Sequence, residues 1–169
     1  TRQAEKILKE LGTPCLIHQP SYNLFNRWVE EDNLLGTLND LGIGSIAFTP
    51  LAQGMLTNKY LNKIPAKSRA NQGKSLDKDK ITPELIQALN ELNDIAANRG
   101  QSLAQMSIAW VLRNGNVTTA LIGASKSEQV EDCVGAVKNL DFNAAELLQI
   151  DAIASDQGIN LWAKSSENN

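Results

Sequence analysis

The 169-residue sequence has little of the chemistry that builds metal sites or disulfide frameworks. It contains one histidine, His18, and two cysteines, Cys15 and Cys133, which are far apart and form no CxxC pair. A single histidine without other good ligands predicts no zinc site. Two distant cysteines are typical of free thiols in a reducing cytosol, so we expect a cytoplasmic protein without a bound metal.

The sequence also lacks long apolar runs and a strong excess of one charge. The longest apolar run, from Ile43 to Leu51, is far too short to span a bilayer. The net charge is −3 and no basic stripe is present, so we expect neither a membrane nor a nucleic-acid partner. The first residues, TRQAEKILKELG, are charged and helical, unlike a signal peptide, and they begin without Met, as a fragment or a processed product would.

Common catalytic motifs are missing too. The sequence has no GxSxG, no HExxH and no P-loop. The carboxylate cluster Glu30-Glu31-Asp32 precedes a predicted helix, which favours a cap or a helix-dipole partner over an acid/base pair.

Helices and strands alternate along the chain, which is the pattern of an α/β protein with parallel βαβ units. The predicted strands are Cys15–Ile17, Ser45–Phe48 and Ala120–Ile122, and a long loop covers residues 51–80. Predicted helices cover Thr1–Leu11, Leu34–Leu41, Pro83–Arg99 after a Thr82 cap, a segment from the Ser102 capping box to Gly115, one from a second capping box at Ser125–Glu128 to about Asn139, and one from the Asn143 cap through Ile153. Three strands are fewer than a complete flavodoxin-like sheet needs, so we expect part of a larger barrel or sheet.

The end of the third predicted strand has the sharpest local pattern. Gly123 is followed by a predicted helix start with Ser125 and Lys126, where backbone N–H groups and the helix dipole favour an anion. The alternative interpretation is a simple cap with a solvated lysine.

The segment after the second predicted strand is the other candidate. Pro50 and Gly54 turn the backbone there, and the exposed amides are able to hold a phosphate. In (β/α)8 barrels the loops after the last two strands often form the phosphate site. The patterns at these two strand ends therefore together favour one phosphate site. Lys59 and Arg69 lie in the long loop that follows, which is either a flap over an anionic cofactor or an ordinary solvated loop.

Four ordered segments resemble the aldo/keto reductases. They are SYNLFNRWVE, IGSIAFTPLAQGMLTNKYL, RGQSLAQMSIAWVLRN and TTALIGASKSEQVED, and the resemblance covers essentially the whole chain. It is strongest to the bacterial glyceraldehyde-3-phosphate (methylglyoxal-reducing) type and to the potassium-channel β-subunit type. The resemblance implies a single partial domain, residues 1–169, forming the C-terminal half of a (β/α)8 TIM barrel, with the three strands as the sixth to eighth.

The resemblance also assigns roles in binding NADP, with NAD left open. Gln19 would contact the nicotinamide carboxamide, and Phe48 would stack on the nicotinamide ring. The pyrophosphate would follow the turn at Pro50, along Thr49, Leu51, Ala52 and Gln53, and Lys59 and Arg69 would clamp it. The adenosine phosphate would meet Gly123, Ser125 and Gln129, and the adenine edge would meet Asp132 and Cys133.

Two positions depart from the usual pattern of the family. Many members have Arg where Gln129 stands, although the channel type also has Gln. Many have Asn where Cys133 stands, and a thiol is a poor hydrogen-bond partner for adenine.

The catalytic Asp, Tyr, Lys and His of the family belong to the first half of the barrel, and none of them has a counterpart in this sequence. His18, beside Gln19, is not the catalytic histidine. We therefore expect a parent enzyme that reduces small carbonyl substrates such as methylglyoxal or glyceraldehyde 3-phosphate, and an isolated chain that is inactive.

Two further hypotheses stay open. One is a non-catalytic redox-sensing module like a potassium-channel β-subunit. The other is a genuine truncated product that folds as a half-barrel and must self-associate, because its open sheet would expose apolar edges, so we expect a homo-oligomer.

Overall fold

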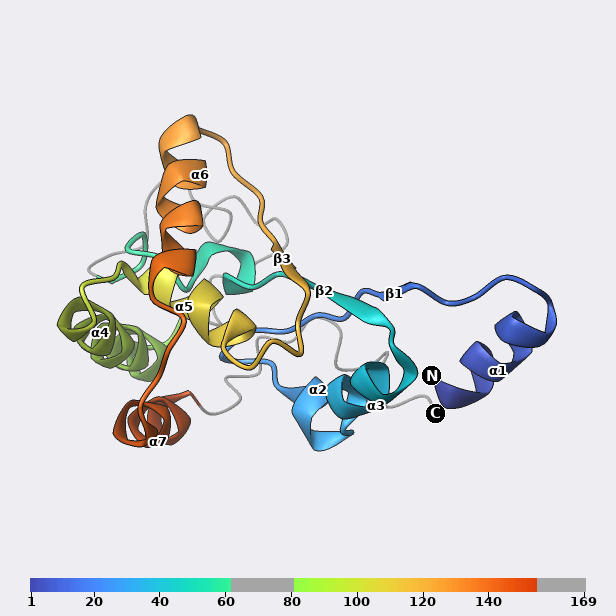
Figure 1. Ribbon diagram of the computed structural model, residues 1–169. Coiled ribbons are helices and arrows are strands. Elements are labelled where there is room, and N and C mark those ends of the chain that lie inside the picture. Colours follow the sequence, from blue (N-terminus) through green and yellow to red (C-terminus); the bar gives the residue numbers. More distant parts are fainter. Residues whose placement is uncertain (62–80, 155–169) are drawn as a thin grey trace.

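The chain folds as an α/β structure with three short parallel strands and helices beside them, and helix α1 stands apart from the rest (Figure 1). The computed structural model describes residues 1–61 and 81–154. The strands are β1 (Ile17–His18), β2 (Gly44–Phe48) and β3 (Thr119–Leu121). The helices are α1 (Arg2–Glu10), α2 (Trp28–Glu31), α3 (Leu34–Leu41), α4 (Pro83–Asn98), α5 (Leu103–Leu112), α6 (Ser127–Val134) and α7 (Ala144–Ile153), with short 3-10 turns η1 (Ala52–Gly54) and η3 (Gly135–Lys138).

The strands lie side by side in chain order, β1-β2-β3, and both neighbouring pairs are parallel. Phe48 at the end of β2 is in register with Leu121 at the end of β3, so the carboxyl ends of these strands are adjacent. Parallel strands joined through helices confirm the predicted βαβ organisation. The sheet is small, as expected of part of a barrel.

The first strand begins later than predicted. The expected strand at Cys15–Ile17 is displaced to Ile17–His18, because pairing with β2 begins at Gly44. The Leu16 carbonyl still accepts a hydrogen bond from the Gly44 amide at 2.9 Å. The partner strand, which sequence periodicity does not reveal, therefore sets the boundary.

Three of the four predicted helix caps are confirmed. The Thr82 hydroxyl accepts from the Leu85 amide at 3.2 Å at the start of α4. Complete capping boxes open α5, through Ser102 and Gln105, and α7, through Asn143 and Glu146. Such caps satisfy amides that the first turn of a helix leaves without partners.

The predicted capping box at Ser125–Glu128 is wrong. Helix α6 begins at Ser127, and its N-cap residue Lys126 makes no side-chain cap. The Ser125 amide donates instead to Gln129 Oε1 at 2.8 Å. Ser125 therefore lies two residues before α6, and its amide is satisfied by a side chain from within that helix.

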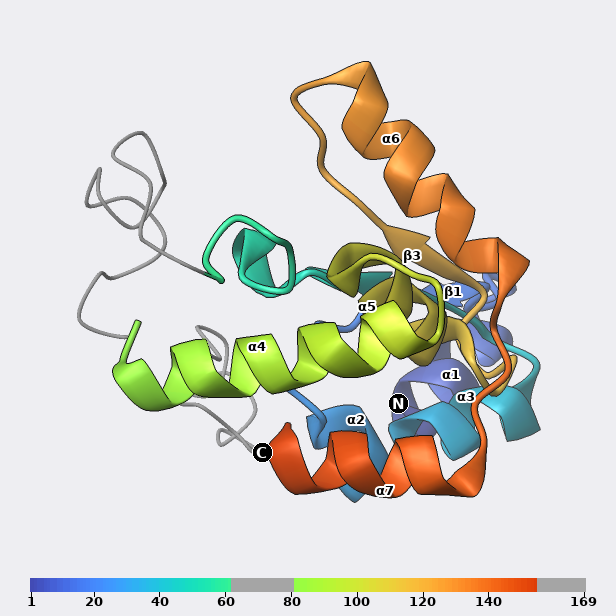
Figure 2. The ribbon, with the colours of Figure 1, turned by 90° about the vertical axis from the view of Figure 1, so that its left-hand side faces the viewer.

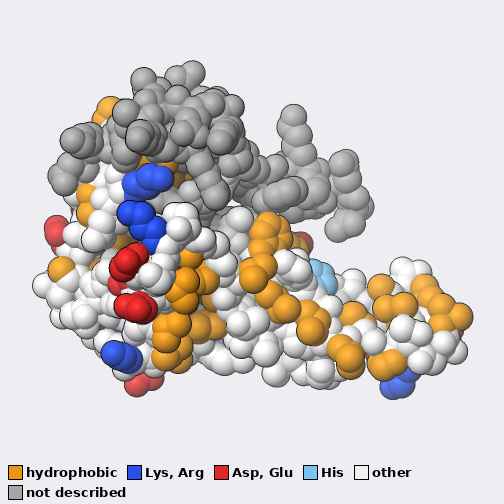
Figure 3. Space-filling view, turned by 90° about the horizontal axis from the view of Figure 1, so that it is seen from above, with side chains coloured by type: hydrophobic (Ala, Val, Ile, Leu, Met, Phe, Trp, Pro, Cys, Tyr) orange, Lys and Arg blue, Asp and Glu red, His pale blue; other side chains and the backbone are white. Residues whose placement is uncertain are grey.

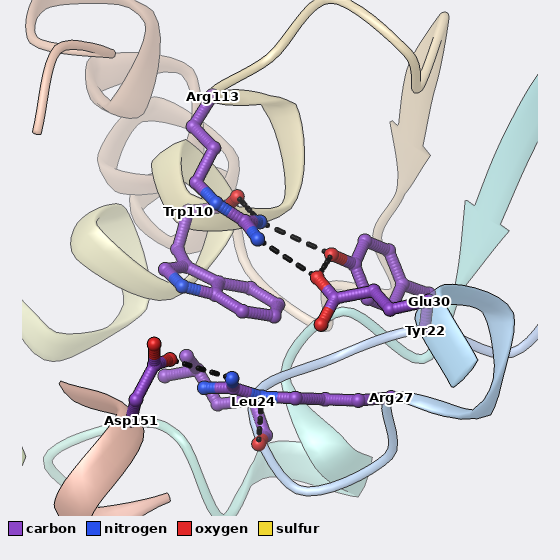
Figure 4. Close-up of polar contacts among 7 residues, drawn as sticks. All are labelled: Tyr22, Leu24, Arg27, Glu30, Trp110, Arg113 and Asp151. Carbon is purple, nitrogen blue, oxygen red and sulfur yellow. Dashed lines mark hydrogen bonds and ion pairs between the residues drawn. The ribbon is translucent and has the colours of Figure 1, made fainter. Parts of the chain in front are cut away.

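Trp110 lies in the core, at the centre of an aromatic and cationic cluster (Figure 4). Its indole lies between two guanidinium groups, with Arg113 Cζ 3.8 Å and Arg27 Cζ 4.5 Å from the ring centroid. The Tyr22 ring packs beside it at a centroid separation of 5.2 Å. Figure 4 shows that this cluster joins the loop after β1 to α5 and α7, since Arg27 also pairs with Asp151 at 2.6 Å.

The carboxylate cluster Glu30-Glu31-Asp32 has a structural role at Glu30. Glu30 pairs with Arg113 at 2.8 Å and accepts a hydrogen bond from the Tyr22 hydroxyl. Glu30 and Glu31 end the four-residue helix α2, and the cluster precedes α3, as predicted. Burial raises the pKa of Tyr22 well above its ordinary value, with a further contribution from Glu30 and an opposing one from Arg113.

Helix α4 connects the packing of α5 with that of α7. Helix α4 packs against α5 on one side and α7 on another, and Figure 2 shows α4 and α7 running side by side. Among residues 1–61 and 81–154, no helix combines the length and the apolar character that a membrane span requires.

Both outer strands carry exposed apolar side chains. Helix α1 projects away from the body, and hydrophobic side chains gather along this arm in Figure 3. Ile17 of β1 is exposed together with Leu11 and Leu16 before it, and Leu121 of β3 is exposed at the other side of the sheet. Within the described part of the chain, no further strand pairs with the outer side of β1 or β3.

Candidate functional site

A cavity of about 950 Å³ opens between the turn after β2 and the start of α6. The predicted residues that line it on the β2 side are Thr49, Pro50, Leu51, Gln53 and Lys59. The predicted residues that line it beyond β3 are Gly123, Ser125, Gln129, Asp132 and Cys133. The structure thus brings both candidate strand ends to one cavity, whose size falls in the range of small-molecule and cofactor pockets.

Three further predicted residues do not line this cavity. Ala52 is buried in η1, and Phe48 is partly buried at the end of β2. Gln19 is exposed immediately after β1, at the same carboxyl edge of the sheet. The fourth, Arg69, lies outside the described residues.

The turn after β2 holds an unusual backbone. Thr49, Ala52 and Gln53 all have positive φ angles, of 55°, 46° and 60°. Residues other than glycine rarely adopt this backbone conformation. It costs about 1–3 kcal/mol at each residue and persists only where the surroundings enforce it. Such strain concentrates at binding sites, and Thr49 and Gln53 both face the cavity.

The α6 wall has a pair of donors aimed at one acceptor. The Ser125 amide lies 2.8 Å and the Ser125 hydroxyl 3.2 Å from Gln129 Oε1. The carboxamide oxygen here stands where an oxygen of an anion would accept the same two hydrogen bonds. The donor set therefore fits a phosphate once Gln129 turns aside.

The far end of the same wall is held by Asp132. Its two carboxylate oxygens each lie 3.1 Å from Ser102 Oγ, the residue that also caps α5. This contact joins α6 to the start of α5 and fixes the carboxylate at the cavity edge. Cys133, the next residue, is a free and nearly buried thiol.

The charge of the described lining is small and mixed. Lys59 is the one basic residue among the lining residues that the structure describes, and Asp132 is the acidic one. A diphosphate would place its charge nearer Lys59, on the β2 side, than Asp132, beyond β3. In the described ranges, no three His, Cys, Asp or Glu side chains gather as a metal site.

Comparison with known proteins agrees with this arrangement. Residues 1–155 match the model of the aldo/keto reductase family. The chain belongs to the aldo/keto reductase family. The resemblance predicted from four sequence segments is thereby confirmed.

Two kinds of relative stand out among the aldo/keto reductases. The chain is 49% identical to L-glyceraldehyde 3-phosphate reductase of Escherichia coli (strain K12), over 99% of this chain and 49% of that protein. It is 34% identical to a probable voltage-gated potassium channel subunit beta of Oryza sativa subsp. japonica, over 84% of this chain and 44% of that protein. The chain spans about half the length of the curated relatives it matches.

Several residues that line the cavity were not predicted from the sequence. Thr57, Asn58 and Ala104 also line it. The Thr57 hydroxyl donates to the Gly54 carbonyl at 2.7 Å and so closes the turn. The polar pair Thr57-Asn58 after the turn was a usable signal. Ala104 lines the cavity because α5 packs against β3 and α6, which local sequence does not reveal.

We predict that Cys133 reacts with iodoacetamide on the order of tenfold more slowly than Cys15 at pH 8. Only the thiolate is reactive, and burial raises the pKa of the Cys133 thiol, with a further contribution from Asp132. Cys15 is more exposed. Mass spectrometry of the two peptides over time measures both rates, with Cys15→Ser as the control for the Cys133 signal. Equal rates would contradict the burial of Cys133.

Proposed function

We propose that residues 1–169 form one partial domain, the C-terminal half of a (β/α)8-barrel aldo/keto reductase, and supply most of its NADP site. The observation that carries this proposal is the single cavity shared by the ends of β2 and β3. Two adjacent parallel strand ends at one cavity are where such barrels place their phosphate-binding loops. Family membership and the reductase relative support the same assignment.

Different residues would contact different parts of the cofactor. Thr49, Leu51 and Gln53 would follow the pyrophosphate after β2, with Lys59 neutralising its charge. On the α6 wall, Ser125 and Gln129 would hold the adenosine phosphate, with Gly123 allowing close approach of the backbone. These positions line the cavity.

The other carried-over residues complete this arrangement. Pro50 shapes the turn and also lines the cavity, and Ala52 continues it. Asp132 and Cys133 would border the adenine. Gln19 and Phe48 would meet the nicotinamide at the ends of β1 and β2, and Arg69 would add a second cation from the long loop.

The parent enzyme would reduce a small carbonyl compound, such as methylglyoxal or glyceraldehyde 3-phosphate. Bound NADPH supplies the hydride in this chemistry. The proton donor and its partners have no counterpart in this sequence, so the chain by itself binds and orients the cofactor without completing the reaction. We place the protein in the cytoplasm, as its free thiols favour.

A second candidate is a redox-sensing module without turnover. The similarity to plant relatives named as potassium channel β subunits favours it. The higher identity to the bacterial reductase, over 99% of this chain, favours the enzyme. Co-purification with a channel and a tetrameric assembly would support the sensing role instead.

The test is to titrate the 169-residue chain separately with NADPH and NADH and to follow nicotinamide fluorescence. We expect saturable binding of both, tighter for NADPH, and no turnover of methylglyoxal. Absence of any saturable binding would refute the cofactor site. Efficient turnover by this chain alone would show that it contains a proton donor that the sequence assignment lacks.

A further inference from the structure

The segment that follows β1 buries an unusual set of polar side chains. Ser21, Asn23 and Asn26 are all nearly inaccessible to solvent. Buried polar groups are normally hydrogen-bonded, since an unmet donor or acceptor is destabilising. None of these residues lines the cavity. We refer to residues 21–26 as the support loop.

The support loop holds Thr49 through both its side chain and its backbone. The Ser21 and Thr49 hydroxyl oxygens are 2.9 Å apart, and Asn23 Nδ2 donates to the Thr49 carbonyl at 3.0 Å. Asn26 Nδ2 donates to Ser21 Oγ at 3.0 Å, which orients the serine hydroxyl. The contacts bridge 26 to 28 positions of sequence.

The loop is itself fixed to the strand and to the core. The Tyr22 amide donates to the Phe48 carbonyl at 3.2 Å, and the Phe48 amide donates to the Pro20 carbonyl at 3.0 Å. Trp28 Nε1 donates to the Ser21 carbonyl at 3.0 Å. The loop is therefore a rigid base rather than a mobile cover.

Thr49 is the residue that needs such a base. It is the first of the positive-φ residues after β2, with φ of 55°, and it faces the cavity. A strained conformation is retained only when neighbouring contacts over-determine it. The two support-loop hydrogen bonds act on this residue directly.

We infer that Ser21 and Asn23 are positioning residues for the dinucleotide site. They act through Thr49, by holding the turn after β2 in the shape that presents Thr49, Leu51 and Gln53 to the cavity. This inference rests on the proposed function, because it concerns the same cavity. Ser21 and Asn23 would thus contribute to binding although neither lines the cavity.

A double-mutant cycle on NADPH affinity tests the inference. Ser21→Ala should weaken NADPH binding about three- to tenfold, the equivalent of one lost hydrogen bond. In a Thr49→Ala background, Ser21→Ala should change affinity by less than about twofold, because the partner hydroxyl is already gone. Ser107→Ala is the matched control, since it removes another buried serine hydroxyl, bonded to the Leu103 carbonyl at 2.7 Å in α5. That control should lower stability without changing affinity.

Unchanged affinity in Ser21→Ala, or full additivity with Thr49→Ala, would overturn the inference. If the unmodified chain binds no NADPH, the proposed function fails. Hydrogen exchange of the amides at 49–54 then tests separately whether the support loop holds the turn after β2. Ser21→Ala should speed that exchange about tenfold if the support loop holds the turn. Exchange no faster than in Ser107→Ala would overturn it.

Discussion

Trp110→Ala lowers the free energy of unfolding by about 3–5 kcal/mol, the range for deleting a buried aromatic side chain. Trp110 is 0% exposed and packs between the guanidinium groups of Arg27 and Arg113. The substitution leaves a cavity, and it removes the aromatic faces against which both cations lie. Urea denaturation followed by circular dichroism measures the change.

The control for this substitution is Val134→Ala, on a side chain that is 60% exposed. Its expected effect is about 0.5 kcal/mol or less, because surface truncations away from special features change stability little. A loss below about 1 kcal/mol for Trp110→Ala would contradict the central position of this cluster in the core.

We predict that the 169-residue chain self-associates and that Leu16→Lys weakens this association about 10- to 100-fold, the range for losing one buried leucine at an interface. Leu16 is 70% exposed beside the outer edge of β1, where the described sheet ends. An open strand edge with apolar side chains is a template for pairing with another chain, and a lysine there opposes it. Light scattering across a dilution series measures the dissociation constant.

Leu148→Lys is the matched control for this prediction. Leu148 is also 70% exposed, but it lies on α7, away from the strand edges (Figure 1). We expect the control to leave the association unchanged. A sharp monomer peak of the unmodified chain, with a cooperative melt, would refute the self-association.

Local chemistry made much of the fold predictable. The starts of three helices were predictable from their cap residues, Thr82, Ser102 and Asn143, because a cap requires only residues within one turn. The adjacency of Phe48 and Leu121 followed from the preference of parallel strands for pairing in chain order. The sequence alone was therefore sufficient to predict which two strand ends share the cavity.

Contacts over long sequence separations were not predictable in the same way. Ser125 looked like a cap, yet its amide donates a hydrogen bond to the Gln129 side chain. Glu30 looked like a dipole partner, yet its partner Arg113 is 83 positions away. The support of Thr49 by Ser21 spans 28 positions. A pattern of local spacing carries no record of such pairs, which tertiary packing alone decides.

The most direct test of the account is hydrogen exchange of the 169-residue chain with and without saturating NADPH, followed by mass spectrometry. We expect slower exchange in two separate stretches at once, 49–59 after β2 and 123–133 beyond β3. Protection in only one of these stretches, or in neither while nicotinamide fluorescence reports binding, would contradict a single dinucleotide site shared by the two strand ends.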